Sequence, residues 1–248
     1  MRFNVYREAK VSLYIFSVIL AIAVLFYFFA SIFTSMGFSG LSKDAFEEVH
    51  ECIKTTVIID PGHGGEDPGA VANGIVEKDI NLSISTILNE YLTTFGFETA
   101  MSRSSDKLLY NSGEENRKKY YDIRNREAFA NSYSNALFVS VHMNKFPAEY
   151  CNGFQTFYSE NNNKSKLLAD SIQQNARILQ YTNQRKVLSG NETIYLLDAL
   201  KIPAVLVECG FTSNVSEAMR FKNIEYHAKI AFSIFCGISE YLEKDYED

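Results

Sequence analysis

Three side chains that can bind a metal ion stand where apolar runs of the chain end. His63 follows one run after a Pro-Gly pair, His142 ends a second run and Glu208 ends a third. The chain contains 4 histidines, and two of them occupy these positions. Two imidazoles and one carboxylate, with a fourth position left to water, are a common ligand set for catalytic zinc. The residue types therefore point to a hydrolytic metal site.

The residues alone leave the choice of carboxylate open. A metal-assisted hydrolase also needs a second carboxylate that stays off the ion and accepts a proton from the water. Acidic residues at a helix N-terminus can simply complement the helix macrodipole, which is the structural alternative for Glu77 and Asp79. Glu208 could instead form an ion pair with Arg103 or Arg126. The candidates for the two roles are Glu66, Asp67, Glu77, Asp79 and Glu208.

The loop that carries His63 is rich in residues with special backbone properties. Glycines and prolines make up most of positions 61–69. Glycine lets a backbone approach a bound group closely, and proline adds rigidity. We expect these glycines to leave room for a substrate at the metal.

Strand and helix patterns alternate along residues 55–248. Near-continuous apolar runs predict strands, and apolar residues at helical spacing predict helices. The charged stretch 104–121 predicts a surface loop with a helical piece. We expect strands at 56–60, 97–102, 137–142, 153–158 and 204–208, and helices at 80–95, 122–134, 164–180 and, as one or two helices, 216–243.

This alternation predicts the α/β class, as a single domain with a mostly parallel twisted sheet flanked by helices on both faces. Ligands bind such sheets beyond the carboxyl ends of the strands. His63, His142 and Glu208 stand at the carboxyl ends of three predicted strands. We therefore expect the three side chains to meet at one edge of the sheet.

An apolar segment precedes this domain. Residues 11–33 carry no charge and are long enough to cross a bilayer as a helix, which needs about 20 residues. Basic residues before it and acidic residues after it leave the N-terminus in the cytoplasm and export the rest. The run exceeds the roughly 7–15 apolar residues of a cleaved signal, so we expect a retained anchor that holds the domain on the extracytoplasmic face of the membrane. A buried core helix, or cleavage and secretion, are the alternatives. The predicted divisions are a cytoplasmic N-terminus at 1–10, a transmembrane anchor at 11–33, a linker at 34–54 and a catalytic domain at 55–248.

Composition narrows the range of partners. Hydrophobic residues make up 46% of the 248 residues, enough for a substantial core, and the formal net charge is -6. A chain with this charge and no long basic run is poorly suited to bind nucleic acid. Export would permit disulfides, but Cys209 and Cys236 lie in apolar surroundings, so we expect them to be buried thiols.

Five parts of the chain form an ordered set of motifs: Ile59–Gly65, Glu77–Leu82, Arg126 with Ala130–Asn131, Ser140–Asn144 and Pro203–Phe211. In this order they resemble segments of the zinc-dependent N-acetylmuramoyl-L-alanine amidases, which cut the stem peptide from the glycan of the bacterial cell wall. The resemblance covers residues 55–245, and the charged stretch 104–121 matches the family poorly.

Carried over by position, the resemblance implies that His63, Glu77 and His142 bind one Zn²⁺ ion and that Glu208 is the catalytic carboxylate. The implied reaction is hydrolysis of the amide between N-acetylmuramic acid and the L-Ala of the stem peptide by zinc-activated water. Met143 stands where the family has a small residue, but on an alternating strand it points away from His142. A zinc peptidase or deacetylase of the cell wall, and a non-catalytic wall-binding protein on the same fold, are the alternatives.

Three further residues are candidates for substrate contacts. Asn144 lies two residues after His142, hence on the same face of a strand, where it can bind substrate or cap the strand end. Arg103 and Arg126 can meet the carboxylates of stem peptides or pair with structural acids.

A single anchor on a bare catalytic domain resembles the sporulation branch of the family. Its members act on spore cortex ahead of muramic δ-lactam formation and are needed for germination. The implied partners are peptidoglycan and, through the N-terminal helix, a bacterial membrane such as that of the forespore. Because the three metal ligands come from distant loops, an activating protein could control metal capture.

Overall fold

The computed structural model describes residues 55–179 and 183–245. The predicted cytoplasmic N-terminus, transmembrane anchor and linker lie outside these residues, so the membrane anchor stays a prediction. Within the described ranges, every helix is too short or too polar to span a bilayer.

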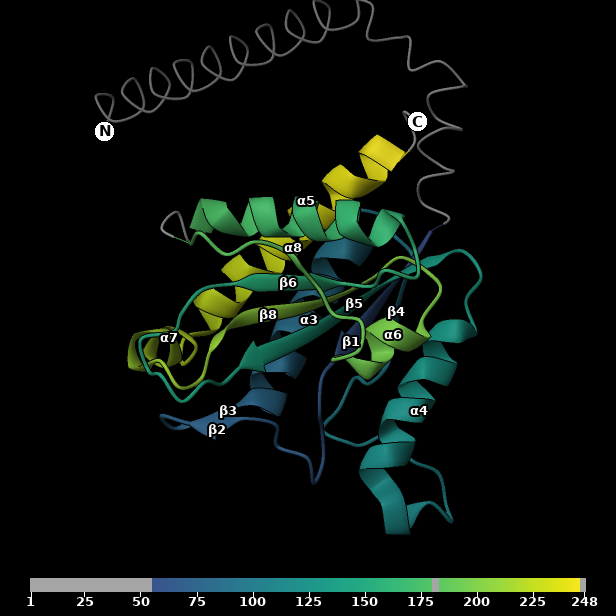
Figure 1. The fold of residues 1–248 in the computed structure, drawn as a ribbon, viewed down its shortest axis with the longest axis horizontal. Coiled ribbons are helices and arrows are strands. Elements are labelled where there is room, and N and C mark those ends of the chain that lie inside the picture. Colours follow the sequence, from purple (N-terminus) through teal and green to yellow (C-terminus); the bar gives the residue numbers. More distant parts are fainter. Residues whose placement is uncertain (1–54, 180–182, 246–248) are drawn as a thin grey trace, which may run out of the picture. The chain divides into compact units, whose positions relative to one another are not determined.

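A six-stranded sheet forms the centre of the described domain (Figure 1), with strand order β4-β1-β5-β8-β6-β7. The four strands from β4 to β8 run parallel, whereas β6 is antiparallel to β8 and β7 is parallel to β6. The predicted mostly parallel sheet is confirmed. The strands are β1 (Thr56–Pro61), β4 (Thr99–Met101), β5 (Ala136–Asn144), β6 (Gln155–Tyr158), β7 (Leu188–Ser189) and β8 (Ala204–Phe211).

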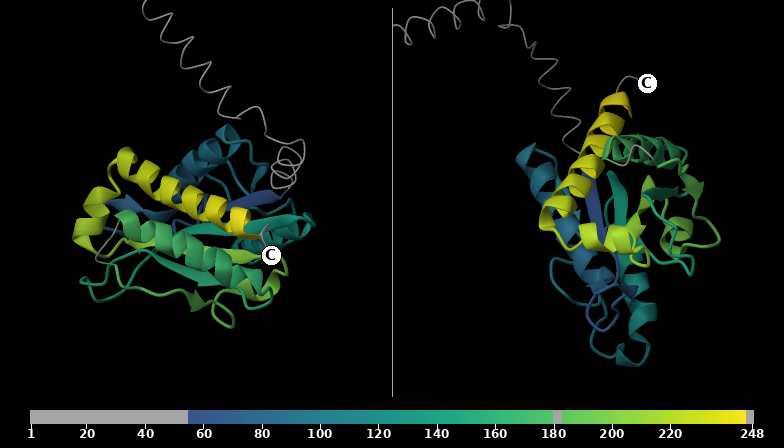
Figure 2. Two further views of the ribbon diagram at one scale, coloured as in Figure 1. Left: turned by 90° about the horizontal axis from the view of Figure 1, so that it is seen from above. Right: turned by 90° about the vertical axis from the view of Figure 1, so that its left-hand side faces the viewer.

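Helices cover both faces of the sheet, as predicted. On one face, α5 and α8 run side by side and α3 packs against α8 (Figure 2). On the other face, α4 and α6 cover the strands (Figure 1). Short segments complete the connections. The helices are α3 (Glu77–Thr94), η1 (Glu115–Arg117), α4 (Lys118–Asn131), α5 (Lys164–Leu179), α6 (Tyr195–Ala199), α7 (Val215–Arg220) and α8 (Ile224–Asp245).

Alternation along β5 divides the apolar core in two. Val141 and Met143 belong to the core beneath α3, α5 and α8, whereas Phe138 belongs to the core beneath α4 and α6. Successive side chains of a strand point to opposite faces, so His142 lies on the α4 and α6 side. The prediction that Met143 points away from His142 is confirmed, and Met143 is 3% exposed.

Several boundaries differ from the prediction. The helix expected from residue 80 begins at Glu77, and the one expected from residue 122 begins at Lys118. A small hairpin, β2 (Val71–Ala72) with β3 (Ile75–Val76), was not predicted. Its signal was present, because the Asn73-Gly74 pair supplies the positive φ angles of a type I′ turn. The first two differences concern charged first turns, where apolar periodicity gives no signal.

The cysteines follow the prediction in part. Cys151, Cys209 and Cys236 are free thiols, and Cys209 is completely buried in the larger core. Cys236 is only partly buried and packs against the same core. Cys52 lies outside the described residues.

Candidate active site

The parallel arrangement of β1, β5 and β8 places their carboxyl ends at one edge of the sheet. His63 lies two residues beyond β1, and His142 lies near the end of β5. Glu208, on β8, is the register partner of His142. The expectation that the three side chains gather at one edge is therefore confirmed.

Glu77 completes a compact group with the two histidines. Its Oε1 atom lies 3.2 Å from Nε2 of His63 and 3.0 Å from Nδ1 of His142. The two imidazole rings are nearly perpendicular, with centroids 4.9 Å apart. One donor atom from each of the three residues lies within 4.8 Å of the other two.

The backbone holds the Glu77 carboxylate in place. Glu77 is the first residue of α3 and is 3% exposed. Its Oε2 accepts a hydrogen bond of 2.7 Å from the amide of Ala70, and its Oε1 accepts one of 3.0 Å from the amide of Met143. The hairpin that the sequence analysis missed lies between Ala70 and Glu77, so it brings these two groups together.

The other carboxylates in this stretch have different partners. Asp67 bonds Nδ1 of His63, on the side of the ring away from Glu77. Glu66 is exposed and forms an ion pair with Lys118. The geometry thus selects Glu77, among the carboxylates near His63, as the one that lies against both histidines. We refer to His63, Glu77 and His142, whose donor atoms could hold a metal ion, as the metal-binding group.

Two glycines of the loop, Gly62 and Gly69, make room for the proposed ligands rather than for a substrate, which corrects our expectation at these two positions. A Cβ atom at Gly62 would stand 2.2 Å from Nε2 of His142. A Cβ atom at Gly69 would stand 2.6 Å from both Oε2 of Glu77 and Cδ2 of His63. The space that these glycines leave is filled by the side chains of the group itself.

Arg103 is hydrogen-bonded to the backbone of the loop that carries His63. Arg103 is 1% exposed, and its guanidinium donates hydrogen bonds to the carbonyl oxygens of Pro61, Gly62, Lys78 and Ser105 at 2.9–3.1 Å. These contacts are those of a structural cation, although its partners are carbonyl oxygens rather than the structural acids that the sequence suggested.

Arg126 connects the loop to α4. It is 2% exposed, and it pairs with the buried carboxylates of Asp60 and Asp122. It also donates a bond of 2.7 Å to the carbonyl oxygen of His63, whose φ of 60° is unusual for a residue other than glycine. Arg126 therefore holds the backbone of His63 in this conformation, and it pairs with structural acids rather than with Glu208.

The charged stretch 104–121, whose role the sequence did not reveal, packs on the same loop. The Asp106 carboxylate accepts bonds of 2.6 Å from the amide of Gly65 and from Nζ of Lys78. Leu108 is buried, and its amide nitrogen would lie 3.1 Å from a Cβ atom at Gly65. The stretch thus packs against the loop that carries His63 and stabilises it through hydrogen bonds.

Glu208 differs from the other acids of the site. Its Oε2 atom is buried and has no hydrogen-bond partner. Burial raises the pKa of Glu208 to about 7, and the charge of Glu77 adds to this, while His142 and His63 act in the opposite direction. A carboxylate whose free oxygen faces no protein donor is available to exchange a proton with a bound molecule.

Opposite charges stabilise each other within the metal-binding group. Burial alone would lower the pKa of His63, but hydrogen bonds and charge from Glu77 and Asp67 raise it to about 9. Burial opposes ionisation of Glu77 as well, yet His142 and His63 hold its pKa well below the usual range. The same negative potential that favours a proton on His63 favours a divalent cation in its place.

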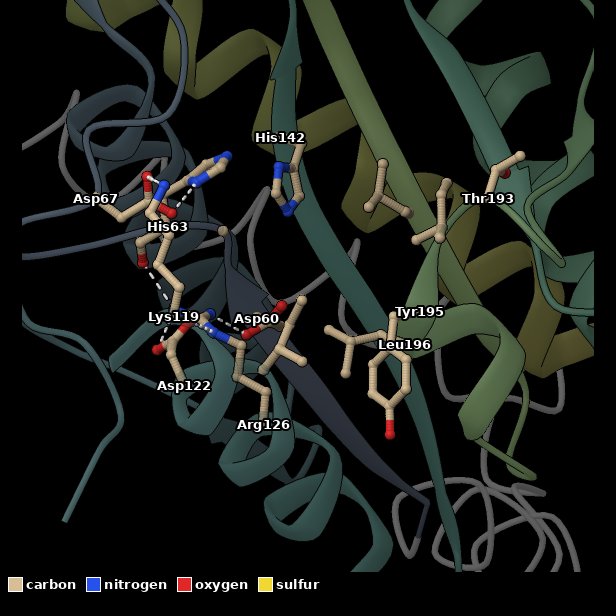
Figure 3. Close-up of a pocket in the computed structure, with 14 residues that line it drawn as sticks. Asp60, His63, Asp67, Lys119, Asp122, Arg126, His142, Thr193, Tyr195 and Leu196 are labelled. Atoms are coloured by element: carbon tan, nitrogen blue, oxygen red, sulfur yellow. Dashed lines mark hydrogen bonds and ion pairs between the residues drawn. The ribbon is translucent and has the colours of Figure 1, made fainter. Parts of the chain in front are cut away.

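A pocket of about 370 Å³ adjoins the two histidines on the α4 and α6 side. Figure 3 shows the rings of His63 and His142 at one end, with Tyr195 and Leu196 of α6 across from them. The sequence gives no signal for the α6 residues, because this five-residue helix is too short to show a periodic pattern. Pocket-lining residues are Asp60, Gly62, His63, Asp67, Lys119, Asp122, Ile123, Arg126, His142, Thr193, Ile194, Tyr195, Leu196 and Leu206.

The position of Asn144 is less regular than expected. The pairing of β5 with β8 shifts register between His142 and Asn144, so simple alternation does not fix the direction of the Asn144 side chain. Its carbonyl oxygen accepts a bond of 2.8 Å from the amide of Thr212. A substrate contact by Asn144 stays a prediction.

The donor set of the group fits a zinc ion. Zinc bonds to imidazole nitrogen and carboxylate oxygen are about 2.0–2.2 Å long, so ligand atoms around a tetrahedral ion lie roughly 3.3 Å apart. The separations of 3.0 and 3.2 Å from Glu77 to the two histidines are close to this value. Two of the three separations thus match a zinc site already, and all three donor atoms lie within 4.8 Å of one another, so the group could hold a metal ion.

Comparisons with known proteins point to one family. Residues 57–240 match the model of a family described as N-acetylmuramoyl-L-alanine amidase. The chain is 35% identical to the germination-specific N-acetylmuramoyl-L-alanine amidase of Bacillus subtilis, across 75% of this chain and 79% of that protein. It is 34% identical to the amidase LytC of the same organism, across 75% of this chain but 35% of LytC.

A solved structure gives the same result. The CwlD amidase from Clostridioides difficile, in complex with the GerS lipoprotein, superposes with a TM-score of 0.74 at 37% identity. The alignment covers 77% of this chain and 100% of that one. These similarities support an amidase over the zinc peptidase, the deacetylase and the non-catalytic wall-binding protein. The chain is an enzyme and belongs to the N-acetylmuramoyl-L-alanine amidase family.

Proposed function

We propose that this amidase hydrolyses the bond between N-acetylmuramic acid and L-Ala with one zinc ion bound by His63, Glu77 and His142. The observation that carries the proposal is the compact group of these three donors beside the unpartnered Oε2 of Glu208. A bound zinc ion would lower the pKa of a water to about 7 and polarise the scissile carbonyl.

Glu208 is the proposed base and acid of the reaction. It removes a proton from the attacking water, whose oxygen bonds to the carbonyl carbon of the lactyl group. It then transfers that proton to the amine of L-Ala as the carbon–nitrogen bond breaks. One residue can serve both steps because its Oε2 atom has no protein hydrogen-bond partner, so it can accept the proton from water and release it to the amine.

The bond that is cut can be identified from the products. Purified peptidoglycan is incubated with the enzyme, with and without a chelator, and the products are analysed by mass spectrometry. The proposal predicts stem peptides with a free L-Ala amine, no product after chelation, and recovery when zinc is added. Peptides cut internally, or release of acetate, would show that the proposed bond is wrong.

We also propose a role in the spore cortex, ahead of muramic δ-lactam formation and needed for germination. Support comes from relatives named as germination-specific, at 35% identity, and sporulation-specific, at 28% identity, both from Bacillus subtilis. A strain without the protein should make cortex that lacks muramic δ-lactam. Muropeptide analysis that finds the usual amount of lactam would contradict this role.

The proposed location is the extracytoplasmic face of a bacterial membrane, through the apolar segment 11–33. Cell fractionation followed by mass spectrometry of the N-terminus tests this proposal. The full-length chain should be found in the membrane fraction. A soluble protein that begins after residue 33 would favour cleavage and secretion.

A protein partner is proposed for the same enzyme. The support is the solved complex of the CwlD amidase with the GerS lipoprotein. If a partner controls metal capture, zinc affinity should differ between the enzyme alone and the enzyme purified together with its partner. Equal affinities would leave no role for a partner in metal capture.

A further inference from the structure

The Asp67 carboxylate lies within hydrogen-bond distance of the second ring nitrogen of His63, a proposed zinc ligand. His63 presents Nε2 toward Glu77, while its Nδ1 lies 2.8 Å from Oδ2 of Asp67 (Figure 3). The Asp67 side chain is 14% exposed, so the contact is largely shielded from water. A ring held in this way can offer only Nε2 to an ion.

We propose that Asp67 is a positioning residue that fixes the tautomer and orientation of His63 and so raises the affinity of the enzyme for zinc. The inference rests on the proposed metal site. When Nε2 binds the ion, Nδ1 carries the proton and donates it to the Asp67 carboxylate. A carboxylate in this position keeps the ring aligned and makes its other nitrogen more basic.

The local fold does not depend on the Asp67 carboxylate. The backbone of Asp67 pairs with that of Gly64 through two hydrogen bonds of 3.0 Å, which close the loop. To the backbone of the loop, the side chain adds only a long bond of 3.4 Å from the amide of Gly69. Replacement of the carboxylate should therefore leave the loop in place.

Lys119 is the other partner of the carboxylate. Its Nζ lies 2.7 Å from Oδ1 of Asp67, so each oxygen has its own cation or ring. The Lys119 side chain is 72% exposed, and an ion pair with so much solvent contributes little. The contact that matters for the metal is the shielded one with His63.

The neighbouring pair provides a matched control. Glu66 directly precedes Asp67 in the loop, and Lys118 directly precedes Lys119 in α4. Nζ of Lys118 lies 2.7 Å from Oε1 of Glu66. The pair thus links the same loop to the same helix. Glu66 is 69% exposed at its side chain, and its recorded bonds go to Lys118 rather than to a histidine ring.

The experiment measures zinc affinity by competition with a chelator, on the full-length enzyme in detergent. Asp67→Ala should weaken zinc binding by about 10- to 100-fold. Asp67→Asn should lose less, because its amide oxygen can still accept the proton of Nδ1. Glu66→Ala should bind zinc within about two-fold of the wild type. Thermal unfolding of the metal-free proteins should show one cooperative transition for all four, with a modestly lower midpoint in Asp67→Ala because its pair with His63 is lost.

Three results would overturn the inference. One is wild-type zinc affinity in Asp67→Ala, and another is an equal loss in Glu66→Ala. The third is a metal-free Asp67→Ala protein that has lost its fold while Asp67→Asn binds as weakly as Asp67→Ala, since the role would then be structural. Failure of the wild type itself to bind zinc would refute the proposed metal site and this inference with it.

Discussion

The two sides of the metal-binding group differ in how completely their buried charged groups are hydrogen-bonded. On the β1 and α4 side, the buried charges of Asp60, Asp122, Arg103 and Arg126 bond to one another, to serine hydroxyls or to backbone groups. On the β8 side, Glu208 stands between the buried apolar residues of its strand with one oxygen unpartnered.

This difference separates the residues that hold His63 in place from the carboxylate proposed to take part in the reaction. Buried polar groups with complete hydrogen bonding fix a structure, and those without it are costly. Through Arg126, the network on the β1 side holds His63 in a backbone conformation that is uncommon for residues other than glycine. The β8 side keeps a carboxylate unpaired, which costs stability but leaves it free to take part in a proton transfer.

Removal of a cation from the complete network should have the largest effect. Arg126→Met leaves Asp60 and Asp122 buried without their partner and should lower the free energy of unfolding by about 3–5 kcal/mol. Urea denaturation measures this change. Arg124→Met is the control, because Arg124 is on the same helix and forms an exposed pair with Glu127. Its effect should stay below about 1 kcal/mol. Equal effects would show that the network carries no special stability.

The unpaired carboxylate of Glu208 should make the stability of the metal-free protein depend on pH. Since burial raises the pKa of Glu208 to about 7, the folded metal-free protein binds this proton more tightly than the unfolded chain. Stability should therefore fall as pH rises from about 5 to 8, by up to roughly 3 kcal/mol at about 1.4 kcal/mol per pKa unit. Glu208→Gln should lack this part of the dependence. Parallel pH profiles of the two metal-free proteins by urea denaturation would contradict the assignment.

Crowding at the ligands should have a smaller effect on stability. Gly62→Ala places a methyl group against the ring of His142 and should cost about 1–3 kcal/mol. Zinc affinity should fall in addition, because the ring has to move. The same substitution in a His142→Ala background should cost less, since the ring is gone. A cost that is unchanged in that background would mean that the ring contact is not the cause.

Much of this site follows from sequence because its parts stand at strand ends. Apolar runs located β1, β5 and β8, and a parallel sheet then brings His63, His142 and Glu208 to one edge. The choice of Glu77 over the other acids came from family resemblance, and the structure adds the reason that two backbone amides hold it.

The supporting residues were harder to predict. Arg103 and Arg126 are charged, and sequence alone does not reveal that their partners are buried carbonyls and acids in the sheet. From its sequence, the stretch 104–121 looks like solvated surface. Its charges in fact bond to a loop about 40 residues away, a contact that no local pattern reveals. Apolar periodicity reports burial of apolar side chains and carries no information about buried polar networks.

The most direct test of the account is the role of Glu208. Wild type and Glu208→Gln are compared for bound zinc and for release of stem peptides from peptidoglycan. The account predicts equal zinc content in the two proteins and a loss of hydrolysis of at least about 100-fold in the variant, as expected for a general acid–base residue. Loss of zinc from Glu208→Gln would make Glu208 a ligand, and retention of full hydrolysis would remove it from the reaction.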